Sequence, residues 1–171
     1  MNGTETLHPP EKLRAEHDVS AFDCGEPVLN DWLRRHALQN QRSGASSMYV
    51  ISDERRVVGY YSLAAGSVAR ETAPRRVRRA VPDPVPVVVF GRLAVDQAFQ
   101  SQGLGRALLR DAALRTLQAA DIIGVRAILV HALSERAKRF YEECGFVPSP
   151  IAPLTLTSTA SEAINALRKK K

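Results

Sequence analysis

The stretch from Val87 to Leu114 constrains the fold of this chain more than any other. It opens with VVVFGRLAV, a mostly apolar run rich in β-branched residues, which follows three prolines (Pro82, Pro84 and Pro86). Such a run is typical of a β-strand buried on both faces. The stretch continues through DQAF into QSQGLGRALLRDAAL, where glycines precede apolar residues at helical spacing. The sequence therefore predicts a buried strand, a tight turn and an amphipathic helix in direct succession.

The turn and the start of the predicted helix, residues 103–120, favour an anion site. Free backbone N–H groups and the positive end of the helix dipole converge there, and glycine lets a phosphate approach the backbone closely. The pattern is Q-x-x-G-x-G, from Gln100 to Gly105, and it matches neither common nucleotide-binding loop. The buried face of the helix is predicted to consist of two apolar rows: Leu104, Leu108 and Ala112, and Leu109, Ala113 and Leu117.

Length and composition predict one globular domain. The chain has 171 residues, which suits a single sizeable core. Residues 1–10 are predicted to be disordered, residues 11–167 to form the domain, and residues 168–171 to be a basic tail. No apolar run approaches the roughly 20 residues of a membrane helix, and the N-terminal segment lacks a signal-peptide pattern. Cys24 and Cys144 match no metal-ligand spacing. We therefore expect buried thiols, no metal and a cytoplasmic location.

Positive charge is concentrated in one internal segment. The net charge is +6, and five arginines fall within ten residues: Arg70, Arg75, Arg76, Arg78 and Arg79. A charge run is usually a solvated face. Arginine clusters also suit phosphate backbones, because a guanidinium binds two oxygens at once. Composition alone leaves both interpretations open.

Periodicity predicts an α+β order of elements. The helices are expected at Val28–Gln41, with Trp32 in the core, at Ser134–Glu143 and at Ala160–Leu167. Residues 69–86 are predicted to form a long basic loop or a short helix. The other strands are expected at Glu11–Glu16, Met48–Ile51, Val57–Val68, Arg126–Ala132, Phe146–Val147 and Leu154–Thr157.

The predicted helix at Ser134–Glu143 has Ser134 as its N-cap and ends at Gly145. Its core stripe is expected to be Leu133, Ala137, Phe140 and Cys144. Tyr141 lies at the edge of this stripe, where its ring can pack while its hydroxyl stays free. From position alone, Tyr141 is an ordinary aromatic at a helix–sheet boundary.

Two segments carry a family resemblance. RLAV followed by QSQGLGRALL resembles motif A of the GNAT superfamily of N-acetyltransferases, and SERAKRFYEECGFVPSP resembles its motif B. With AFDCGEPVLNDWLRRHALQNQRSGAS and GYYSLAAGSV, the likeness narrows to the GNAT-type (TacT-like) toxins of bacterial toxin–antitoxin pairs and extends from about Glu11 to Leu156. It implies a GNAT fold, with a mixed, mostly antiparallel sheet flanked by helices. Its two central strands splay around the pantetheine arm of acetyl-CoA.

The resemblance also implies an activity and partners. Toxins of this family move an acetyl group from acetyl-CoA to the α-amine of the amino acid on charged tRNA, which inhibits translation. A ribbon-helix-helix antitoxin is the expected partner, operator DNA is contacted only through the antitoxin complex, and a homodimer is expected.

Site residues follow from the resemblance by position. Tyr141 matches the tyrosine that acts as general acid toward the leaving thiolate. Backbone groups of Leu93, Ala94 and Val95 match those that hold the thioester and pantetheine. The remaining cofactor-binding residues, most of them pyrophosphate ligands, are Gln100, Ser101, Gln102, Gly103, Leu104, Gly105, Arg106, Ala107 and Ser134.

No general base stands out in the sequence. Glu142 and Glu143 are predicted to be solvated, and His131 is predicted to be a packed, hydrogen-bonded strand residue, with a role as base as the alternative. An α-amine has a reference pKa near 8 and a lysine amine one near 10.4. A missing base therefore suits an α-amine acceptor better than lysine.

If the acceptor is tRNA, Arg75, Arg76, Arg78, Arg79 and Arg92 are the candidate phosphate contacts. Arg92 lies inside the central strand, so either an acidic neighbour or the acceptor site is its expected partner. Two other functions stay open. One is an acetyltransferase with a protein, peptide or small-amine acceptor, and the other is a basic nucleic-acid-binding module without activity.

Overall fold

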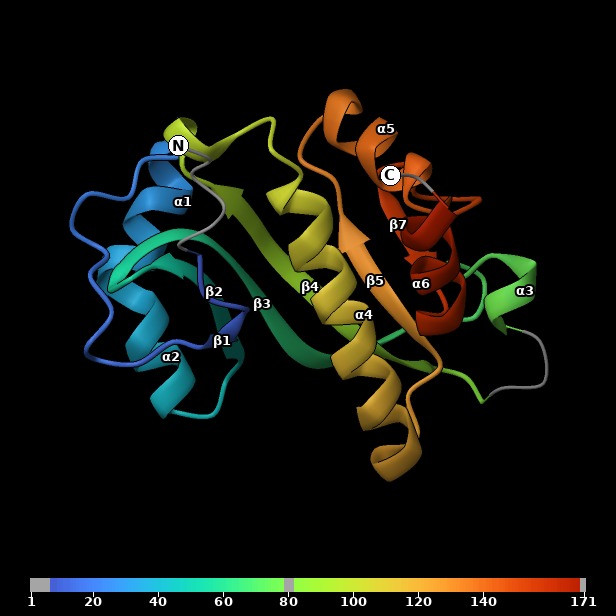
Figure 1. Ribbon diagram of the computed structural model, residues 1–171. Helices are drawn as coiled ribbons and strands as arrows, with labels where there is room; N and C mark the ends of the chain where they lie inside the picture. The colour runs from blue at the N-terminus through green and yellow to red at the C-terminus, as the bar shows by residue number, and fades with distance from the viewer. Residues whose placement is uncertain (1–6, 79–81, 170–171) are drawn as a thin grey trace. The chain divides into compact units, whose positions relative to one another are not determined.

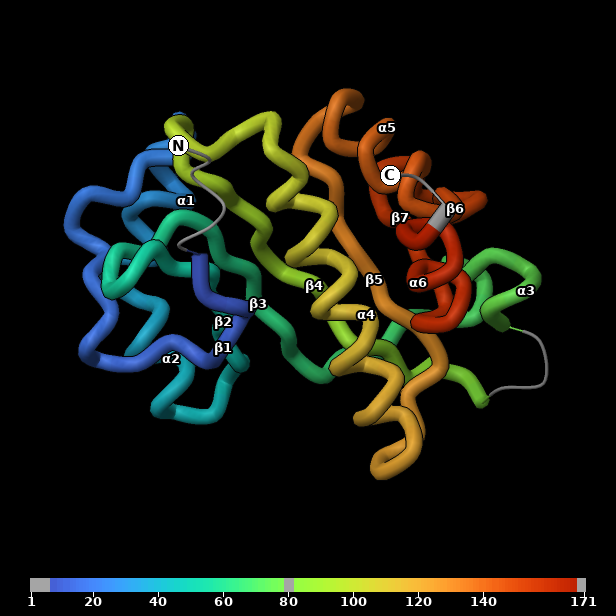
Figure 2. The backbone as a smooth tube through the Cα atoms, viewed as in Figure 1, coloured from blue at the N-terminus to red at the C-terminus, as the bar shows by residue number. Residues whose placement is uncertain are grey.

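The computed structural model describes residues 7–78 and 82–169. The chain forms two compact units, residues 1–64 with 92–109 and residues 65–91 with 110–171. By their residue numbers, two strands, β3 (Arg56–Val68) and β4 (Val85–Val95), and the helix α4 (Leu104–Ile123) have residues in both units. All three are labelled in Figure 2. The single domain over residues 11–167 stays a prediction.

The first unit contains an antiparallel hairpin of β2 (Ser47–Asp53) and β3, in which Val50 pairs with Tyr60. This confirms the two strands predicted around the charged turn. The edge strand β1 (Glu11–Lys12) is shorter than the predicted Glu11–Glu16. The chain turns there, because the Arg14 N–H donates to His17 Nδ1 at 2.9 Å and the His17 N–H donates to the Arg14 carbonyl at 3.1 Å.

Two residues of the segment that was predicted to be disordered, Leu7 and His8, are paired with the chain at the end of β2. Leu7 forms an antiparallel bridge with Asp53, and the His8 N–H donates to the Ser52 carbonyl at 2.9 Å. These bonds tie the segment to the end of β2. Residues 1–6, on which the rest of that prediction falls, lie outside the described residues.

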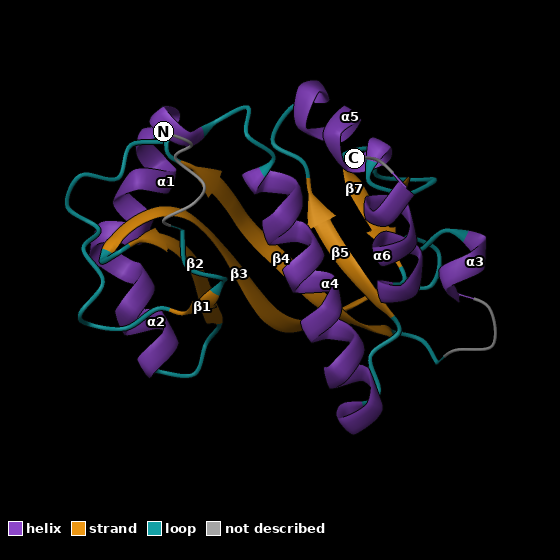
Figure 3. Ribbon diagram, in the orientation of Figure 1, coloured by secondary structure: helices purple, strands orange, loops and turns teal. Residues whose placement is uncertain are grey.

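The predicted helix at Val28–Gln41 is confirmed, and it consists of three successive helical segments. They are α1 (Pro27–Asp31), a π-helical turn η1 (Trp32–His36) and α2 (Ala37–Arg42). Figure 3 shows this stretch as helix around the labels α1 and α2. Pro27 starts the first turn, where its missing N–H costs nothing. Their inner face joins the hairpin in one core, which includes Leu13, Phe22, Leu33, Ala37, Met48, Val50, Val57, Tyr60 and Ala94.

In the second unit, β4 pairs in parallel with β5 (Ala127–His131), from Val87↔Ala127 to Phe90↔Val130. The strand β7 (Thr155–Ser158) pairs antiparallel with β5 and with the short strand β6 (Val147–Pro148). The helices are α3 (Arg75–Arg78), α5 (Glu135–Glu143) and α6 (Ala160–Lys169), labelled in Figure 1. The last turn of α6 thus takes up part of the predicted basic tail, and residues 170–171 lie outside the described residues. A core cluster forms from Ala73, Val77, Val85, Val87, Ala127 and Leu129.

Two predicted core positions are wrong. Leu117 is 40 % exposed, because the row that continues along α4 is Leu108, Ala112 and Thr116. Thr116 is buried and donates its hydroxyl to the Ala112 carbonyl at 2.8 Å. Leu133 is 80 % exposed, because it precedes the N-cap of α5 and helical spacing does not apply to it.

The buried face of α5 is centred on Tyr141 and Cys144, with Ala137 and Phe140 half-buried. Tyr141 therefore lies in the middle of the stripe on whose edge it was predicted. Of the two predicted buried thiols, Cys144 is fully buried and Cys24 is half-buried. No described helix combines the length and apolarity needed to cross a membrane.

Candidate active site

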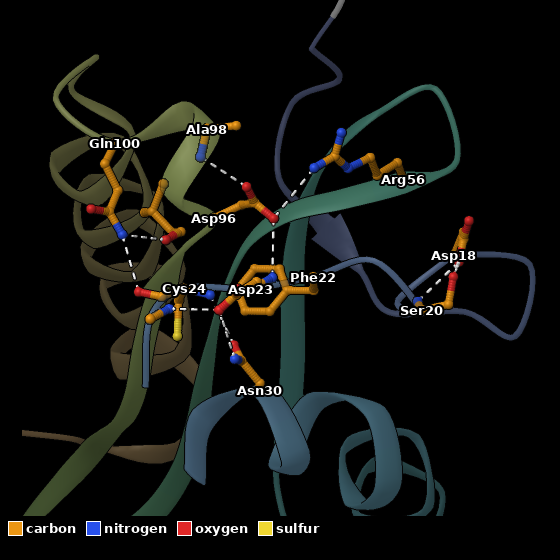
Figure 4. A network of polar contacts seen from close by, with 12 residues as sticks. Asp18, Ser20, Phe22, Asp23, Cys24, Asn30, Arg56, Asp96, Ala98 and Gln100 are labelled. Atoms are coloured by element: carbon orange, nitrogen blue, oxygen red, sulfur yellow. Dashed lines mark hydrogen bonds and ion pairs between the residues drawn. The ribbon is translucent and has the colours of Figure 1, made fainter. Parts of the chain in front are cut away.

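A buried carboxylate fixes the chain between β4 and the glycine-containing turn. Asp96 accepts hydrogen bonds from the Ala98 N–H at 2.9 Å and from the Asp23 N–H at 3.1 Å (Figure 4). The guanidinium of Arg56 lies 3.4 Å from the same carboxylate. The first bond caps the short 3₁₀ helix η2 (Gln97–Phe99). Asp96 therefore joins the end of β4 to η2 and to the loop at residues 18–26.

Gln100 strengthens this connection from the other end of η2. Its side-chain amide donates to the Val95 carbonyl at 2.9 Å and to the Cys24 carbonyl at 3.2 Å (Figure 4). The neighbouring Asp23 side chain accepts from the Gly25 N–H at 2.9 Å and from Asn30 Nδ2 at 3.0 Å. The first of these bonds and then the second hold the pKa of Asp23 below its usual value. Gln100 thus holds the turn in place with its side chain.

The turn itself contains two residues in the left-handed region of φ. Ser101 has φ +64° and Gly103 has φ +83°. Such a conformation costs about 1–2 kcal/mol for a residue with a side chain, so Ser101 stores strain at this point. The turn leads into the N-terminus of α4, a helix of 20 residues. A helix start leaves its first N–H groups without partners inside the helix and carries positive charge, which fits a pyrophosphate.

The structure places the other predicted cofactor residues around this turn in the first unit. Gln102 and Gly103 are exposed, whereas Leu104 is buried. The Ala107 N–H donates to the Gly103 carbonyl at 3.0 Å, so the helix itself uses that donor. The side chain of Ala94 is buried. The remaining members, Leu93, Val95, Gly105 and Arg106, are half-buried.

Replacing Gly103 with alanine tests the turn. A Cβ at Gly103 would meet no atom within 4 Å, so the cost is in the backbone conformation and not in a clash. We expect Gly103→Ala to raise the KM for acetyl-CoA by about 5- to 30-fold, from the roughly 1–2 kcal/mol of left-handed strain. Gly44→Ala is the matched control, because Gly44 has φ +81° and equally open surroundings. A similar KM rise in both variants would contradict the assignment.

Tyr141 is the candidate acid, and it lies in the second unit on α5. Its ring meets Phe140 at 5.2 Å, Phe146 at 5.7 Å and Phe90 at 6.3 Å, edge to face in each case. Burial, and then the neighbouring Cys144, raises the pKa of the Tyr141 hydroxyl above its usual value. Within the described residues, no group hydrogen-bonds to this hydroxyl. The group therefore stays protonated and has its proton available to donate.

Other predicted residues of the second unit have structural roles. The Ser134 hydroxyl accepts from the Ala137 N–H at 3.1 Å, which confirms it as the N-cap of α5. His131 is exposed, not packed, and its Nδ1 lies 3.1 Å from Thr155 Oγ1. Glu142 and Glu143 are exposed, as predicted. They line a pocket of about 400 Å³ together with Arg76 and Glu162.

Several groups of the arginine cluster make contacts within the second unit. Arg126 donates to the carbonyls of Val77 and Arg76 at 3.1 and 3.0 Å. Arg70 donates to the Arg78 carbonyl at 3.3 Å. These bonds cap the C-terminal end of α3. Arg76 lies 3.5 Å from Glu162, whereas Arg75 is exposed, Arg78 is half-buried and Arg79 lies outside the described residues.

Arg92, in the first unit, forms no ion pair with an acidic residue within the described residues, and its contact with the acceptor site stays a prediction. Its guanidinium carbon lies 3.5 Å from the centre of the Trp32 ring. Trp32, which was predicted as core, is half-buried and packs against the core cluster of that unit. Its ring therefore serves both the core and a cation.

Comparison with known proteins identifies the family. The acetyltransferase (GNAT) domain family matches residues 44–148. The chain belongs to the GNAT acetyltransferase family. A tRNA-acetylating toxin of Mycobacterium tuberculosis (strain ATCC 25618 / H37Rv) is 51 % identical over 154 residues, which are 90 % of this chain and 93 % of that protein.

Two solved structures of the AtaT toxin are similar to this GNAT chain. AtaT complexed with acetyl-methionyl-tRNAfMet has a TM-score of 0.84 and 31 % identity, over 91 % of this chain and 95 % of that one. An AtaT mutant with phenylalanine in place of a tyrosine, bound to the C-terminus of the antitoxin AtaR and acetyl-CoA, has a TM-score of 0.79 and 30 % identity, over 97 % and 99 %. The GNAT fold, the enzyme class and the acetyl-CoA co-substrate predicted from the sequence are confirmed.

Sequence reasoning missed the residues that hold the turn of this GNAT enzyme. Asp96 bonds to Asp23 across 73 positions of sequence, and Gln100 bonds to Cys24 across 76, which no local pattern reveals. One local signal was present. Asp96 directly follows a predicted strand and precedes a short polar turn, which is the usual place of a helix N-cap.

Proposed function

We propose that this enzyme transfers the acetyl group of acetyl-CoA to the α-amine of the amino acid on charged tRNA, and so acts as a toxin that inhibits translation. The 51 % identity to a tRNA-acetylating toxin over nearly the whole chain carries this proposal. The AtaT complex with acetyl-methionyl-tRNAfMet supports the same acceptor class.

We propose three roles for the residues of this chain. The backbone N–H groups around Gly103 bind the pyrophosphate, and the backbone at Leu93–Val95 holds the thioester arm. Tyr141 donates its proton to sulfur as the amine nitrogen bonds to the thioester carbon and the carbon–sulfur bond breaks. The amine proton passes to solvent. A positioned general acid contributes about 10²- to 10⁴-fold to such a step.

The pH profile follows from these groups. The α-amine must be neutral, so the transfer rate is expected to rise with pH up to about 8, the reference pKa of an α-amine. Burial raises the pKa of Tyr141 above its usual value, so the acid is lost only at a pH above about 10. Rates on an amide-linked aminoacyl nucleotide, which resists alkaline hydrolysis, are therefore expected to stay level from pH 8.5 to 10. A fall in rate centred near pH 9 would contradict the assignment of Tyr141.

We propose that Arg75 and Arg78 contact tRNA phosphates, and that Arg76 contributes less because Glu162 lies 3.5 Å away. At low salt, Arg75→Ala is expected to raise the KM for charged tRNA by about 3- to 10-fold, and Arg76→Ala by less than about twofold. Neither variant should change transfer to an aminoacyl nucleoside without phosphates. Equal effects of Arg75→Ala and Arg76→Ala on charged tRNA would overturn this ranking.

We also propose the partners of this enzyme. A ribbon-helix-helix antitoxin would neutralise the toxin, and operator DNA would be bound only through that complex. We propose a homodimer and action in the cytoplasm, where charged tRNA is found. The AtaT mutant bound to the C-terminus of the antitoxin AtaR supports the antitoxin.

Transfer of labelled acetyl groups tests the acceptor class. Purified protein is given labelled acetyl-CoA with charged tRNA, deacylated tRNA, free amino acids or a mixture of peptides. Label is expected on charged tRNA alone. Label on free amino acids or peptides, with none on charged tRNA, would replace the proposal with the alternative of a small-amine or peptide acceptor.

A further inference from the structure

The contact between Arg92 and Trp32 is unusually close for a cation and an aromatic ring. The guanidinium carbon lies 3.5 Å from the ring centre, which is the distance of face-to-face stacking. The other cation–π contact in the described residues, between Arg56 and Phe99, is 5.7 Å. Arg56 also has a carboxylate partner in Asp96. Arg92 has no such partner within the described residues.

Both ends of this contact are held by the first unit. The Arg92 N–H donates to the buried hydroxyl of Ser62 on β3 at 3.1 Å, which fixes the backbone of β4 at this residue. Trp32 packs against the core cluster and starts the π-helical turn η1. Such π-turns inside helices occur frequently at functional sites. The guanidinium therefore rests on a ring that is itself fixed.

Stacking leaves the donors of Arg92 available. A guanidinium has five N–H donors in its own plane, and a ring below that plane occupies none of them. Within the described residues, no acceptor is bonded to the side chain of Arg92. The stacked face is apolar and the side chain is half-buried, so the charge has lost part of its hydration. An oxyanion in the guanidinium plane would satisfy both the charge and the donors.

The position of Arg92 in the strand points to the kind of anion. Arg92 directly precedes Leu93–Val95, the segment to which the proposed function assigns the thioester. An anion at Arg92 therefore belongs to the part of the acceptor nearest the reacting amine. In an aminoacyl-tRNA, that anion is the phosphodiester before the terminal adenosine.

We propose that Arg92 binds the 3′-terminal phosphodiester of the acceptor and that Trp32 is the positioning residue that holds its guanidinium for this task. This inference rests on the proposed function. It assigns Trp32, which the sequence indicates only as a core residue, to acceptor recognition.

Two acceptors that differ by one phosphodiester test the inference. They are an amide-linked aminoacyl-adenosine and the same molecule extended by a 5′-linked cytidylate. The wild type is expected to use the dinucleotide with a kcat/KM about tenfold or more above that of the nucleoside, from one charge-assisted hydrogen-bonded contact. Trp32→Leu and Arg92→Leu are expected to bring this ratio close to one.

Further variants separate positioning from folding. Trp32→Phe keeps a ring face and is expected to restore most of the ratio, although phenylalanine binds cations less well than tryptophan. Phe99→Leu removes the other cation–π contact and is expected to keep the full ratio. Thermal unfolding of each variant shows how much of any loss in kcat/KM comes from a less stable fold.

The outcomes distinguish a failure of the role of Arg92 and Trp32 from a failure of the proposed function. If Trp32→Leu and wild type share the same ratio, or if the variant loses both acceptors equally, the inference is overturned while acetylation of charged tRNA by the wild type still supports the proposed function. If the wild type shows no preference for the dinucleotide, the inference alone is overturned. If it acetylates neither these acceptors nor charged tRNA, the proposed function is overturned as well.

Discussion

Tyr141→Phe is expected to lower the rate of acetyl transfer to charged tRNA by at least about a hundredfold, the lower end of what a general acid contributes. The substitution removes one oxygen and keeps the ring contacts with Phe140, Phe146 and Phe90. Binding of acetyl-CoA and the melting temperature should therefore stay close to those of the wild type. Single-turnover transfer rates, measured beside calorimetric binding of acetyl-CoA, separate the two quantities.

Tyr60→Phe is the matched control for this variant. Tyr60 is also buried, and burial likewise raises the pKa of its hydroxyl. Its hydroxyl donates to the Leu29 carbonyl at 2.8 Å, a structural bond. We expect the control to lose about 1 kcal/mol of stability and to keep its transfer rate. If Tyr141→Phe keeps its rate as well, the thiolate leaves without help from this hydroxyl, and the acid must be sought elsewhere.

Asp96→Ala is expected to cost about 2–4 kcal/mol of folding stability, because it leaves the N–H groups of Asp23 and Ala98 without their acceptor. For a chain of this length, that cost corresponds to a fall in melting temperature of about 5–15 °C. The loop at residues 18–26 and the turn before α4 lose their common anchor. We therefore also expect the KM for acetyl-CoA to rise, as measured by initial rates below the melting temperature.

Two variants show which bonds of Asp96 matter. Asp96→Asn keeps one carbonyl oxygen as acceptor and is expected to recover about half of the loss. Arg56→Met removes the partner at 3.4 Å, but the Arg56 side chain is 42 % exposed, so we expect less than about 1 kcal/mol. A loss in Arg56→Met as large as that in Asp96→Ala would show that the ion pair, not the backbone bonds, stabilises the turn.

The elements of the fold could be predicted where local pattern and burial agree. The hairpin from Ser47 to Val68 and the capped helix after Ser134 follow from alternation, glycine position and N-cap chemistry, which act within a few residues. The errors arose in two places. One is a residue that lies beyond the end of a helix, and the other is a residue at which the 3.6-residue repeat no longer faces the core. Leu133 precedes its helix, and Leu117 lies where the 3.6-residue repeat has turned the row toward solvent.

In the candidate site, too, the features with a local sequence signal could be predicted and the contacts between distant residues could not. The turn from Gln100 to Gly105 could be found because glycine and helix-start signals are adjacent in the sequence. The contacts that hold it could not, since Asp96 meets Asp23 across 73 positions. The contact of Arg92 could not be predicted either, since its partner Trp32 lies 60 positions earlier. The local sequence pattern shows Trp32 only as one more apolar residue on a helix. Cation–π partners carry no sequence pattern of their own.

The chemical position of the transferred acetyl group shows whether this enzyme acetylates the α-amine of the amino acid on charged tRNA. Charged tRNA is incubated with the wild-type enzyme and labelled acetyl-CoA, the ester bond is then cleaved by mild alkali, and the released amino acid and the tRNA are analysed by mass. We expect the label to leave with the amino acid as its N-acetyl form and the tRNA to be unlabelled. Label that stays on the tRNA bases, or transfer to deacylated tRNA at the same rate, would contradict it.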